Sequence, residues 1–348
     1  MPGRLRQTPR HMSGVGLIGC GWVACEKHLP ALARVDGLDV VGLHDTDPAA
    51  MARAGVLAPG ARHHEELTAL VEDPAVDVVA VLSPPTHHLE HSVAAFAAGK
   101  QVLCEKPLAL TREEAGAICE AAADSGLLGA TGLMSRALRV VQRARREITE
   151  GGIGELVAVC TLYADSVADE GLGDRPWRRR QASGGGALQE KLVHHVDLWR
   201  YLTGLEVEQA RSERIHSSRE EDEAVLLTAR LTGGVLASSM GLDRAATVNE
   251  IHVLGSHGQV ALDLYRVDGF RLEGRNQVSG EPGVRLRRVA GAAAKLPSVA
   301  AQVRSGGEFG NSYVRQWEAF RDGTPLATLE DGRRATEVLE MAVEEQVA

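Results

Sequence analysis

Short apolar runs alternate with helical stretches over the first 131 residues of the chain, and this alternation restricts the fold more than any other feature. The runs lie at residues 15–18, 38–43, 76–82, 101–104 and 127–131. The run at 76–82 is apolar at nearly every position, as expected for a strand that is covered on both faces. Strands that alternate with helices through short loops form a parallel sheet. We therefore predict a doubly wound α/β domain for the first part of the chain.

The remainder of the chain has a different pattern, in which β-rich runs follow one another closely. These runs lie at 156–163, 224–231, 235–240, 250–254 and 259–264, and glycine-containing turns separate several of them. Helical stretches are expected at 137–150, 188–202, 311–320 and 332–347. Closely spaced strands with tight turns indicate antiparallel pairing. The second part is therefore predicted to be an α+β domain with a large, open, mostly antiparallel sheet.

A chain of 348 residues is long enough for two domains. Its net charge of −9 and its aromatic content of 3% argue against nucleic acids and anionic membranes as partners. The five cysteines contain no C-x-x-C pair, so neither a disulfide framework nor a structural zinc site is predicted. No apolar run is long enough to span a bilayer, and residues 1–13 lack the core of a signal peptide. We expect a cytoplasmic protein with a disordered lead-in at residues 1–12.

Gly19-x-Gly21-x-x-Ala24 follows the first predicted strand and opens a helix. The first glycine permits a tight turn, the second lets the backbone approach a pyrophosphate, and the alanine lets helix and strand pack closely. The start of the helix, at Trp22 and Val23, would offer free N–H groups and a favourable dipole to the phosphates. A purely structural glycine turn matches the same pattern, but the strand before it and the helix after it favour a dinucleotide site.

Asp45 ends the second predicted strand, where the dinucleotide fingerprint requires an acid. Its carboxylate would accept hydrogen bonds from the ribose 2′- and 3′-hydroxyls and would repel a 2′-phosphate. A simple turn residue beside Asp47-Pro48 is the alternative interpretation. NAD is therefore the predicted cofactor, and NADP stays an alternative.

Two further polar segments come directly after buried strands. Ser-Pro-Pro at 83–85 follows the strand at 76–82, and Glu-Lys-Pro at 105–107 follows the strand at 101–104. Buried Glu and Lys cost free energy unless they pair or meet a ligand, and proline cannot continue a central strand. Ligands of open parallel sheets sit beyond the carboxyl ends of the strands. Both segments and Asp45 are therefore expected to line one crevice.

A second chemical site is predicted at the triple glycine 184–186 and the helix that follows it. A helix that begins just after these glycines would place Glu190, His194 and Asp197 on one face, because positions i, i+4 and i+7 align. A carboxylate one turn from an imidazole can orient the ring and stabilise its protonated form. An ordinary helix with an exposed Glu–His pair is the alternative, but the triple glycine lets the backbone approach a ligand and favours catalysis. His195 would point elsewhere and is interpreted as structural.

Other clusters carry weaker chemical signals. The basic run at 175–180 contains Trp177 and is either a solvated loop or a loop that faces an anion or a substrate. Histidines gather at His63-His64 and within 87–91, but H-E-x-x-H is absent and no third ligand has convincing spacing. These histidines are interpreted as surface or crevice residues, and no metal site is predicted.

Taken in order along the chain, these motifs resemble the glucose–fructose oxidoreductase/inositol dehydrogenase (Gfo/Idh/MocA) family over nearly its full length. The matching segments are Gly19-x-Gly21-x-x-Ala24, His28-Leu29-Pro30, Asp45, Ser83-Pro84-Pro85-x-x-His88, Ala98 to Ala109, Trp177-Arg178 and Glu190-x-x-x-His194-x-x-Asp197. The resemblance implies an NAD-binding Rossmann domain at 13–135 and a substrate and oligomerisation domain at 136–348. It also implies a nicotinamide oxidoreductase of sugars or cyclitols, similar to inositol 2-dehydrogenases, that forms a homo-oligomer (a dimer or tetramer) through the open sheet.

The same resemblance assigns roles to individual residues. Lys106 is the active-site lysine, His194 takes the place of the catalytic histidine, and Glu190 that of a carboxylate that is usually Asp. Cofactor contacts are implied for Gly19, Gly21, Trp22, Val23, Asp45, Ser83, Pro84, His88, Glu105 and Lys106. Substrate contacts are implied for Trp177, Arg178 and Asp197, and the alternative for Asp197 is a supporting role in its helix.

Two positions depart from the family's pattern. Glu190 carries one methylene more than the usual Asp, a shift of about 1 Å, which can matter greatly for catalysis. Leu192 stands where the family usually has Gly.

The assigned roles predict the reversible oxidation of a ring CH–OH to a ketone. His194 would take the hydroxyl proton, and Lys106 would stabilise negative charge on the reacting oxygen. An inositol-type substrate is the first choice, and the Ala-, Arg- and Gly-rich composition leaves a role in aminocyclitol antibiotic biosynthesis open. A ketosugar reductase, an NAD-dependent glycoside hydrolase and a non-catalytic NAD-binding regulator are the alternatives.

Overall fold

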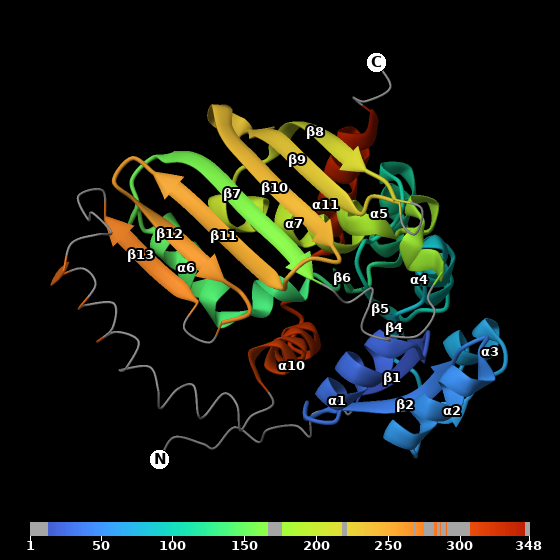
Figure 1. The fold of residues 1–348 in the computed structure, drawn as a ribbon. Helices are drawn as coiled ribbons and strands as arrows, with labels where there is room; N and C mark the ends of the chain where they lie inside the picture. The colour runs from blue at the N-terminus through green and yellow to red at the C-terminus, as the bar shows by residue number, and fades with distance from the viewer. Residues whose placement is uncertain are drawn as a thin grey trace, which may run out of the picture.

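The computed structural model describes residues 13–165, 176–217, 221–266, 269–274 and 307–344, together with residues 282, 283, 286 and 290. The lead-in predicted at 1–12 lies outside the described residues. Within the described part, the chain builds two units, each on one sheet (Figure 1).

A six-stranded parallel sheet forms the first unit. Its strands are β1 (Ser13–Ile18), β2 (Leu38–His44), β3 (Arg62–His63), β4 (Val78–Val81), β5 (Gln101–Cys104) and β6 (Gly129–Thr131). Their order is β3-β2-β1-β4-β5-β6, and all neighbouring pairs are parallel. The connections carry η1 (Ala24–His28), α1 (Leu29–Leu32), α2 (Pro48–Leu57), α3 (Leu67–Val71), η2 (Pro85–His87), α4 (His88–Ala97) and α5 (Arg112–Ser125). The predicted doubly wound sheet is confirmed.

Burial on both faces explains the continuous apolar run of β4. Val78 and Ala80 join a hydrophobic cluster with α10 (Gly307–Arg321), whereas Val79 and Val81 join a cluster with α5. Because successive side chains of a strand point to opposite faces, both sets are covered only if helices lie on both sides. The strand ends are thereby left as the accessible edge of the sheet.

Helix α10 returns from the C-terminal part of the chain to the first unit. Its buried Trp317 lies in the same hydrophobic cluster as Val15 and Leu17 of β1. The domain boundary at 135/136 stays a prediction, to which the structure adds that residues 307–321 pack against the N-terminal sheet.

A seven-stranded sheet forms the second unit and confirms the predicted open, mostly antiparallel sheet. Its strands are β7 (Leu156–Asp165), β8 (Val207–Ile215), β9 (Ala224–Leu231), β10 (Val235–Asp243), β11 (Val248–Gly255), β12 (Gly258–Asp263) and β13 (Phe270–Gly274). Their order is β13-β12-β11-β7-β10-β9-β8, in which only β7 and β10 pair in parallel. Helices α6 (Arg139–Thr149), α7 (Val193–Thr203) and α11 (Leu329–Glu344) lie against one face (Figure 1).

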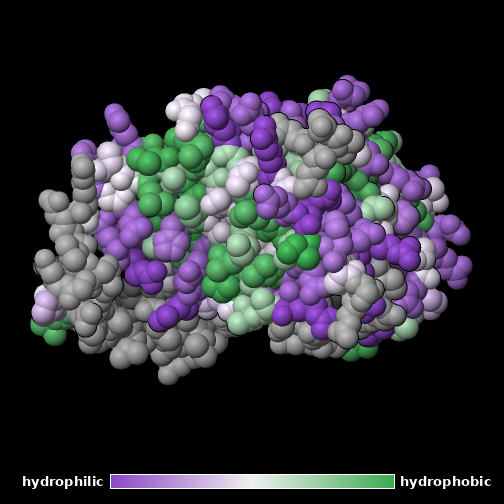
Figure 2. All heavy atoms as spheres, turned by 45° about the horizontal axis from the view of Figure 1, so that its top comes forward, coloured by the Kyte–Doolittle hydropathy of each residue, from purple (hydrophilic) through white to green (hydrophobic). Residues whose placement is uncertain are grey.

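The opposite face of this sheet carries no helix in the described part of the chain (Figure 1). Met240 of β10 pairs with Leu226 of β9, Leu236 lies on the same side as Met240, and all three side chains are exposed. Figure 2 shows hydrophobic side chains gathered on this side of the molecule between polar surroundings.

Among the described residues, we find no helix whose length and hydropathy would let it cross a bilayer.

Candidate active site

The dinucleotide turn has room for a ligand on one side and none on the other. Gly19 has φ +95°, and a β-carbon there would lie 2.6 Å from the carbonyl carbon of Leu82. A β-carbon at Gly21 would meet nothing within 4 Å, so the backbone is open to a ligand at this point. Trp22, at the start of the helix, is exposed. This open cradle at a helix start fits the pyrophosphate of a dinucleotide.

Asp45 lies directly after β2 and beside this turn. Its Oδ2 accepts a hydrogen bond from the backbone N–H of Cys20 at 2.6 Å, and its Oδ1 accepts from Asp47 at 2.8 Å. These bonds fix the carboxylate against the glycine turn. Each carboxylate oxygen keeps a further lone pair, which suits the hydroxyls of a ribose. The geometry therefore fits NAD at the predicted place.

His88 was predicted to contact the cofactor, and the structure gives it a different task. The residue is buried, and its two ring nitrogens face the carbonyl oxygens of Ser83 and Pro107 at 2.9 and 2.8 Å. Burial lowers the pKa of His88. A neutral ring has one N–H and donates to one of the two carbonyl oxygens. From its position between the loops after β4 and β5, His88 holds these loops together.

Glu105 was also predicted at the cofactor, but it too is committed within the protein. Oε1 of Glu105 faces Nε2 of His28 at 3.0 Å, and Oε2 accepts from the backbone N–H of Lys106 at 3.1 Å. The indole N–H of Trp317 donates to Nδ1 of His28 at 3.1 Å. Because an indole nitrogen only donates, Nδ1 of His28 is the acceptor and Nε2 carries the proton that Glu105 accepts. Glu105 thus ties the end of β5 to α10.

Lys106 reaches across to the second unit. Its Nζ donates to the backbone carbonyl of Glu190 at 2.9 Å and lies 3.6 Å from Oε2 of the same residue. Nη2 of Arg178 donates to this Oε2 at 2.6 Å. Burial alone would raise the pKa of Glu190, but Lys106 and Arg178 outweigh it and hold that pKa well below its usual range. Glu190 is therefore a permanent carboxylate between two cations.

His194 lies on the same helical segment but makes a different contact. Its Nδ1 faces Oγ of Ser135 at 3.5 Å. Burial, with the nearby Lys106 as a second cause, lowers the pKa of His194 well below its usual value, so the ring is neutral at pH 7. The predicted orientation of His194 by Glu190 is not what the structure shows, because Glu190 pairs with Lys106 and Arg178 instead. No sequence motif had indicated Ser135.

The helix after the triple glycine begins with a wide turn. Residues Leu188–Leu192 form the π-helix η6, which continues into α7, where a regular α-helix was expected. Such turns are frequent at functional sites. A β-carbon at Gly185 would collide with the backbone carbonyl of Arg178, so the glycine lets this loop pack directly on the helix start. That approach brings the guanidinium to Glu190.

Asp197 was predicted to contact the substrate, and this prediction is corrected. Its side chain is fully buried, and both carboxylate oxygens accept hydrogen bonds from Arg136 at 2.6 to 3.1 Å. The same guanidinium lies 2.9 Å from Asp331 of α11. Arg136 therefore joins Asp197 of α7 to Asp331 of α11, in agreement with the supporting role held as the alternative for Asp197. His195 is buried between Ser239 and Asn249 and is structural, as predicted.

A buried lysine beside the site had no sequence signal. Nζ of Lys191 lies 2.7 Å from Asp165 and 2.6 Å from Asp243, and all three side chains are nearly inaccessible. The two aspartates face each other at the carboxyl ends of the parallel strands β7 and β10. With the cluster of Lys106, Arg178 and Glu190, three cations and three carboxylates meet at this junction. Their charges balance, which reduces the cost of burying them.

Ser83, Pro84, Trp177 and Val23 are the remaining residues predicted to contact the cofactor or the substrate. Ser83, after β4, faces Nδ1 of His91 through its hydroxyl at 2.9 Å, and Pro84 follows it without a side-chain contact that we can assign. Trp177 is half-buried in η4 (Pro176–Arg179), ahead of the glycine loop. Contacts of these three residues and of Val23 with a cofactor or substrate stay predictions. Residues 166–175, between β7 and η4, lie outside the described residues.

Comparisons with known proteins agree with this geometry. A family model described as "Oxidoreductase family, NAD-binding Rossmann fold" matches residues 13–133, and one described as "GFO/IDH/MocA C-terminal domain" matches residues 141–261. The 1,5-anhydro-D-fructose reductase of Ensifer adhaerens is 31% identical over 338 residues, which cover 92% of each chain. The inositol 2-dehydrogenase 2 of Saccharopolyspora erythraea is 32% identical over 194 residues, which cover 56% of this chain and only 54% of that protein.

Among solved structures, the WlbA dehydrogenase of Bordetella pertussis in complex with NADH and UDP-GlcNAcA matches with a TM-score of 0.79 at 19% identity. The match covers 97% of this chain and 96% of that one. At this identity the likeness shows the shared fold.

Proposed function

Because this chain belongs to the Gfo/Idh/MocA family of NAD-binding oxidoreductases, we propose that it transfers a hydride between NAD and a ring carbon of a sugar or cyclitol. One observation carries the proposal: Lys106 of the first unit contacts Glu190 of the second, one helical turn from neutral His194. An ammonium, a fixed carboxylate and a free base thus meet at the edge of the sheet that holds the dinucleotide turn.

His194 is the proton acceptor of the proposed oxidation. A base must be unprotonated to accept, and the lowered pKa of His194 keeps it so at pH 7. With Nδ1 facing Ser135, Nε2 is the nitrogen that takes the proton of the substrate hydroxyl. In the reverse direction the same nitrogen returns the proton to the ketone oxygen.

Lys106 provides the positive charge next to the reacting oxygen. Its Nζ has three N–H donors, of which Glu190 uses part, so a donor is left for the substrate. A preorganised cation stabilises the negative charge that develops on oxygen as the proton leaves. Glu190 and Arg178 fix the position of this cation. The bound nicotinamide ring supplies the hydride acceptor for oxidation and the hydride donor for reduction.

Two variants test these roles. His194→Ala and Lys106→Met should each lower kcat about 10²- to 10⁴-fold, the usual contribution of a positioned acid or base. Both should still bind NADH, measured by nucleotide fluorescence, because the glycine turn and Asp45 remain in both variants. His257→Ala, at the exposed turn between β11 and β12, is the matched control and should keep full kcat. Full turnover in either site variant would overturn the assignment.

A panel of substrates tests which class of molecule the enzyme oxidises and which cofactor it uses. We propose an inositol-type cyclitol as the substrate class, and a narrower role on aminocyclitols of antibiotic pathways as its extension. Inositols, aminocyclitols and sugars are offered with NAD⁺ and with NADP⁺, and the reduced cofactor is followed by absorbance. Turnover of sugars alone would remove the cyclitol proposal but not the hydride-transfer proposal. Equal rates with NADP⁺ would contradict the role of Asp45.

A ketosugar reductase is the second candidate, because the 1,5-anhydro-D-fructose reductase matches this chain over nearly the full length of both. The same residues serve both directions, so the test is NADH consumption with 1,5-anhydrofructose and other ketosugars. A net change of one NADH per turnover, released by the dehydrogenase or consumed by the reductase, separates either oxidoreductase from a glycoside hydrolase that keeps its NAD. NADH binding without turnover of any polyol or ketosugar would favour the remaining alternative, a non-catalytic NAD-binding regulator.

A homo-oligomer, a dimer or tetramer, is proposed on the open face of the second sheet. Leu226, Leu236 and Met240 are exposed side by side on this face, where a second copy of the chain would bury them. Light scattering of the wild type and of Leu236→Asp measures the oligomeric state. A wild-type monomer, or an unchanged oligomer in the variant, would refute this surface.

A further inference from the structure

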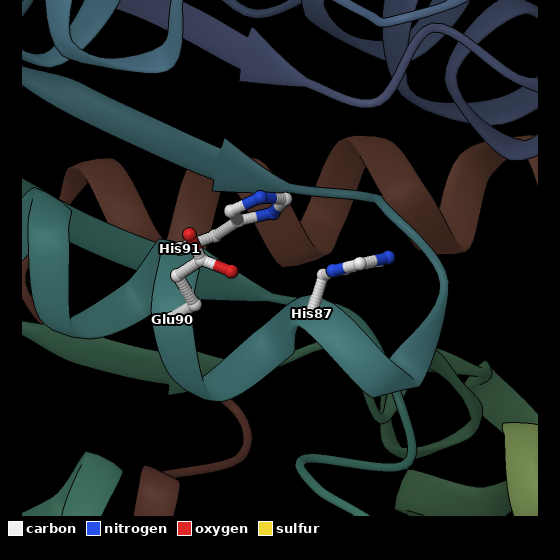
Figure 3. Close-up of side chains that lie close together, drawn as sticks. All are labelled: His87, Glu90 and His91. Atoms are coloured by element: carbon white, nitrogen blue, oxygen red, sulfur yellow. The ribbon is translucent and has the colours of Figure 1, made fainter.

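A cluster of two imidazoles and one carboxylate lies at the start of α4, outside the machinery described above. His87 ends η2, and Glu90 and His91 lie in the first turn of α4. One ligand atom from each of the three residues lies within 4.8 Å of the others. Figure 3 shows the three side chains gathered about this one helical turn. The spacing i, i+3, i+4 accounts for this, because such positions share one face of a helix.

The three side chains have the chemistry of a transition-metal site. Two imidazole nitrogens and one carboxylate oxygen suit zinc and leave one position of a tetrahedron for water. The rings of His87 and His91 are stacked, with centroids 5.5 Å apart and an interplanar angle of 17°, so both present their edges together. By contrast, calcium and magnesium require more oxygen ligands than this cluster offers.

Ser83 provides the partner that metal-binding histidines usually have. Its Oγ lies 2.9 Å from Nδ1 of His91 and holds the ring in one orientation. Histidine ligands almost always use their second nitrogen in such an outer hydrogen bond, which fixes the tautomer. Nδ1 is thereby occupied, and Nε2 of His91 is the nitrogen left for a metal.

Only small movements are needed to close the site. Zinc–ligand distances of about 2.1 Å place the ligands of a tetrahedron about 3.4 Å apart, so the widest separation must shrink by at most about 1.4 Å. His87 and Glu90 are exposed, and rotation about their side-chain bonds covers this distance without moving the backbone.

We propose that His87, Glu90 and His91 bind a divalent transition-metal ion of the zinc class, with Ser83 as the outer partner of His91. This site is separate from the hydride-transfer residues, although Ser83 also borders the edge of the sheet where the cofactor is placed. Its occupancy does not depend on the proposed reaction, so the test uses metal binding rather than turnover.

The experiment titrates the full chain, without an affinity tag, with Zn²⁺ in a calorimeter. The wild type should bind one ion, and Co²⁺ in its place should give the visible bands of a tetrahedral site. His87→Ala, which loses no hydrogen bond that we observe and should fold normally, is expected to weaken binding at least about ten-fold. The double variant His87→Ala/His91→Ala should abolish it, and Ser83→Ala should weaken it by about 10- to 100-fold.

The matched control is His252→Ala. His252 also lies near a glutamate, with Nε2 3.9 Å from Oε2 of Glu250, but among the described residues it belongs to no group of three possible metal ligands. Its loss should leave Zn²⁺ affinity unchanged. A wild type that shows no saturable Zn²⁺ binding would overturn the proposal. Equal affinity in the wild type and in the folded His87→Ala variant would do the same, because the ion then binds elsewhere.

Discussion

A β-carbon placed on Gly241 would lie 2.9 Å from Cδ2 of Leu192, which is fully buried in η6 against β10. Leu192 stands where the family usually has Gly, and the chain accommodates the larger side chain by leaving position 241 without one. The departure from the family's pattern is thus compensated within the neighbouring strand.

Gly241→Ala should therefore destabilise the protein by about 1–3 kcal/mol, the usual cost of overpacking a core. Urea denaturation followed by circular dichroism measures the change. In a Leu192→Ala background the same substitution should cost much less, because the space is then free, and the difference is the coupling energy of the pair. An identical cost in both backgrounds would show that the two side chains do not compete.

Lys191→Met should lower the free energy of unfolding by about 3–5 kcal/mol, because it leaves Asp165 and Asp243 facing each other in a buried site. Burial already raises the pKa of Asp243 and Lys191 opposes this, so the variant raises that pKa further above its unfolded value. Stability from a raised carboxyl pKa is present at low pH and is lost as pH rises through the folded pKa. The deficit of the variant relative to wild type should therefore be larger at pH 7.5 than at pH 5, measured as urea midpoints. Lys191→Arg, which keeps the charge, is the control, and equal deficits at the two pH values would contradict the ion cluster.

Glu190→Asp tests the methylene group that Glu190 has in addition to the family's usual Asp. The shorter side chain withdraws its carboxylate by about 1 Å from Arg178 and Lys106, and a misplacement of this size can cost about 10²-fold in rate. We expect a loss of kcat of that order with unchanged NADH affinity. Glu190→Gln keeps the length but leaves two cations without a carboxylate, so it should also lower the melting temperature. Full kcat in the Glu190→Asp variant would mean that the position of Lys106 does not depend on the length of the side chain at 190.

Local patterns made the first unit and the outline of the site predictable. The apolar run of β4 and the glycine turn at 19–21 depend on residues close in sequence, and the structure confirms the parallel sheet they indicated. Lys106 and His194 were proposed as site residues because each follows a local motif, at a strand end and after a triple glycine.

The partners of these residues were not predictable, because pairing depends on contacts far apart in the chain. Glu105 is held by His28, 77 residues away, and Asp197 by Arg136, 61 residues away. A π turn at 188–192 stands where a regular α-helix was expected, so a spacing of four residues no longer guarantees that Glu190 and His194 share a face. Sequence spacing fixes a face only when the helix is regular.

The buried His195 predicts a loss of stability in acid. Burial lowers its pKa to about 4, against 6.5 in the unfolded chain, so the unfolded state binds more protons between these values. Unfolding free energy should therefore fall by about 2 kcal/mol from this residue alone as pH drops from 7 to 5. His195→Gln keeps a donor for Asn249 and an acceptor for Ser239 but cannot titrate, so it should lose less stability than the wild type over the same interval. Urea midpoints at pH 7, 6 and 5 give the slope of the unfolding free energy against pH for the wild type and for the variant. Parallel slopes for the two proteins would show that His195 is protonated at the same pH in the folded and unfolded chain.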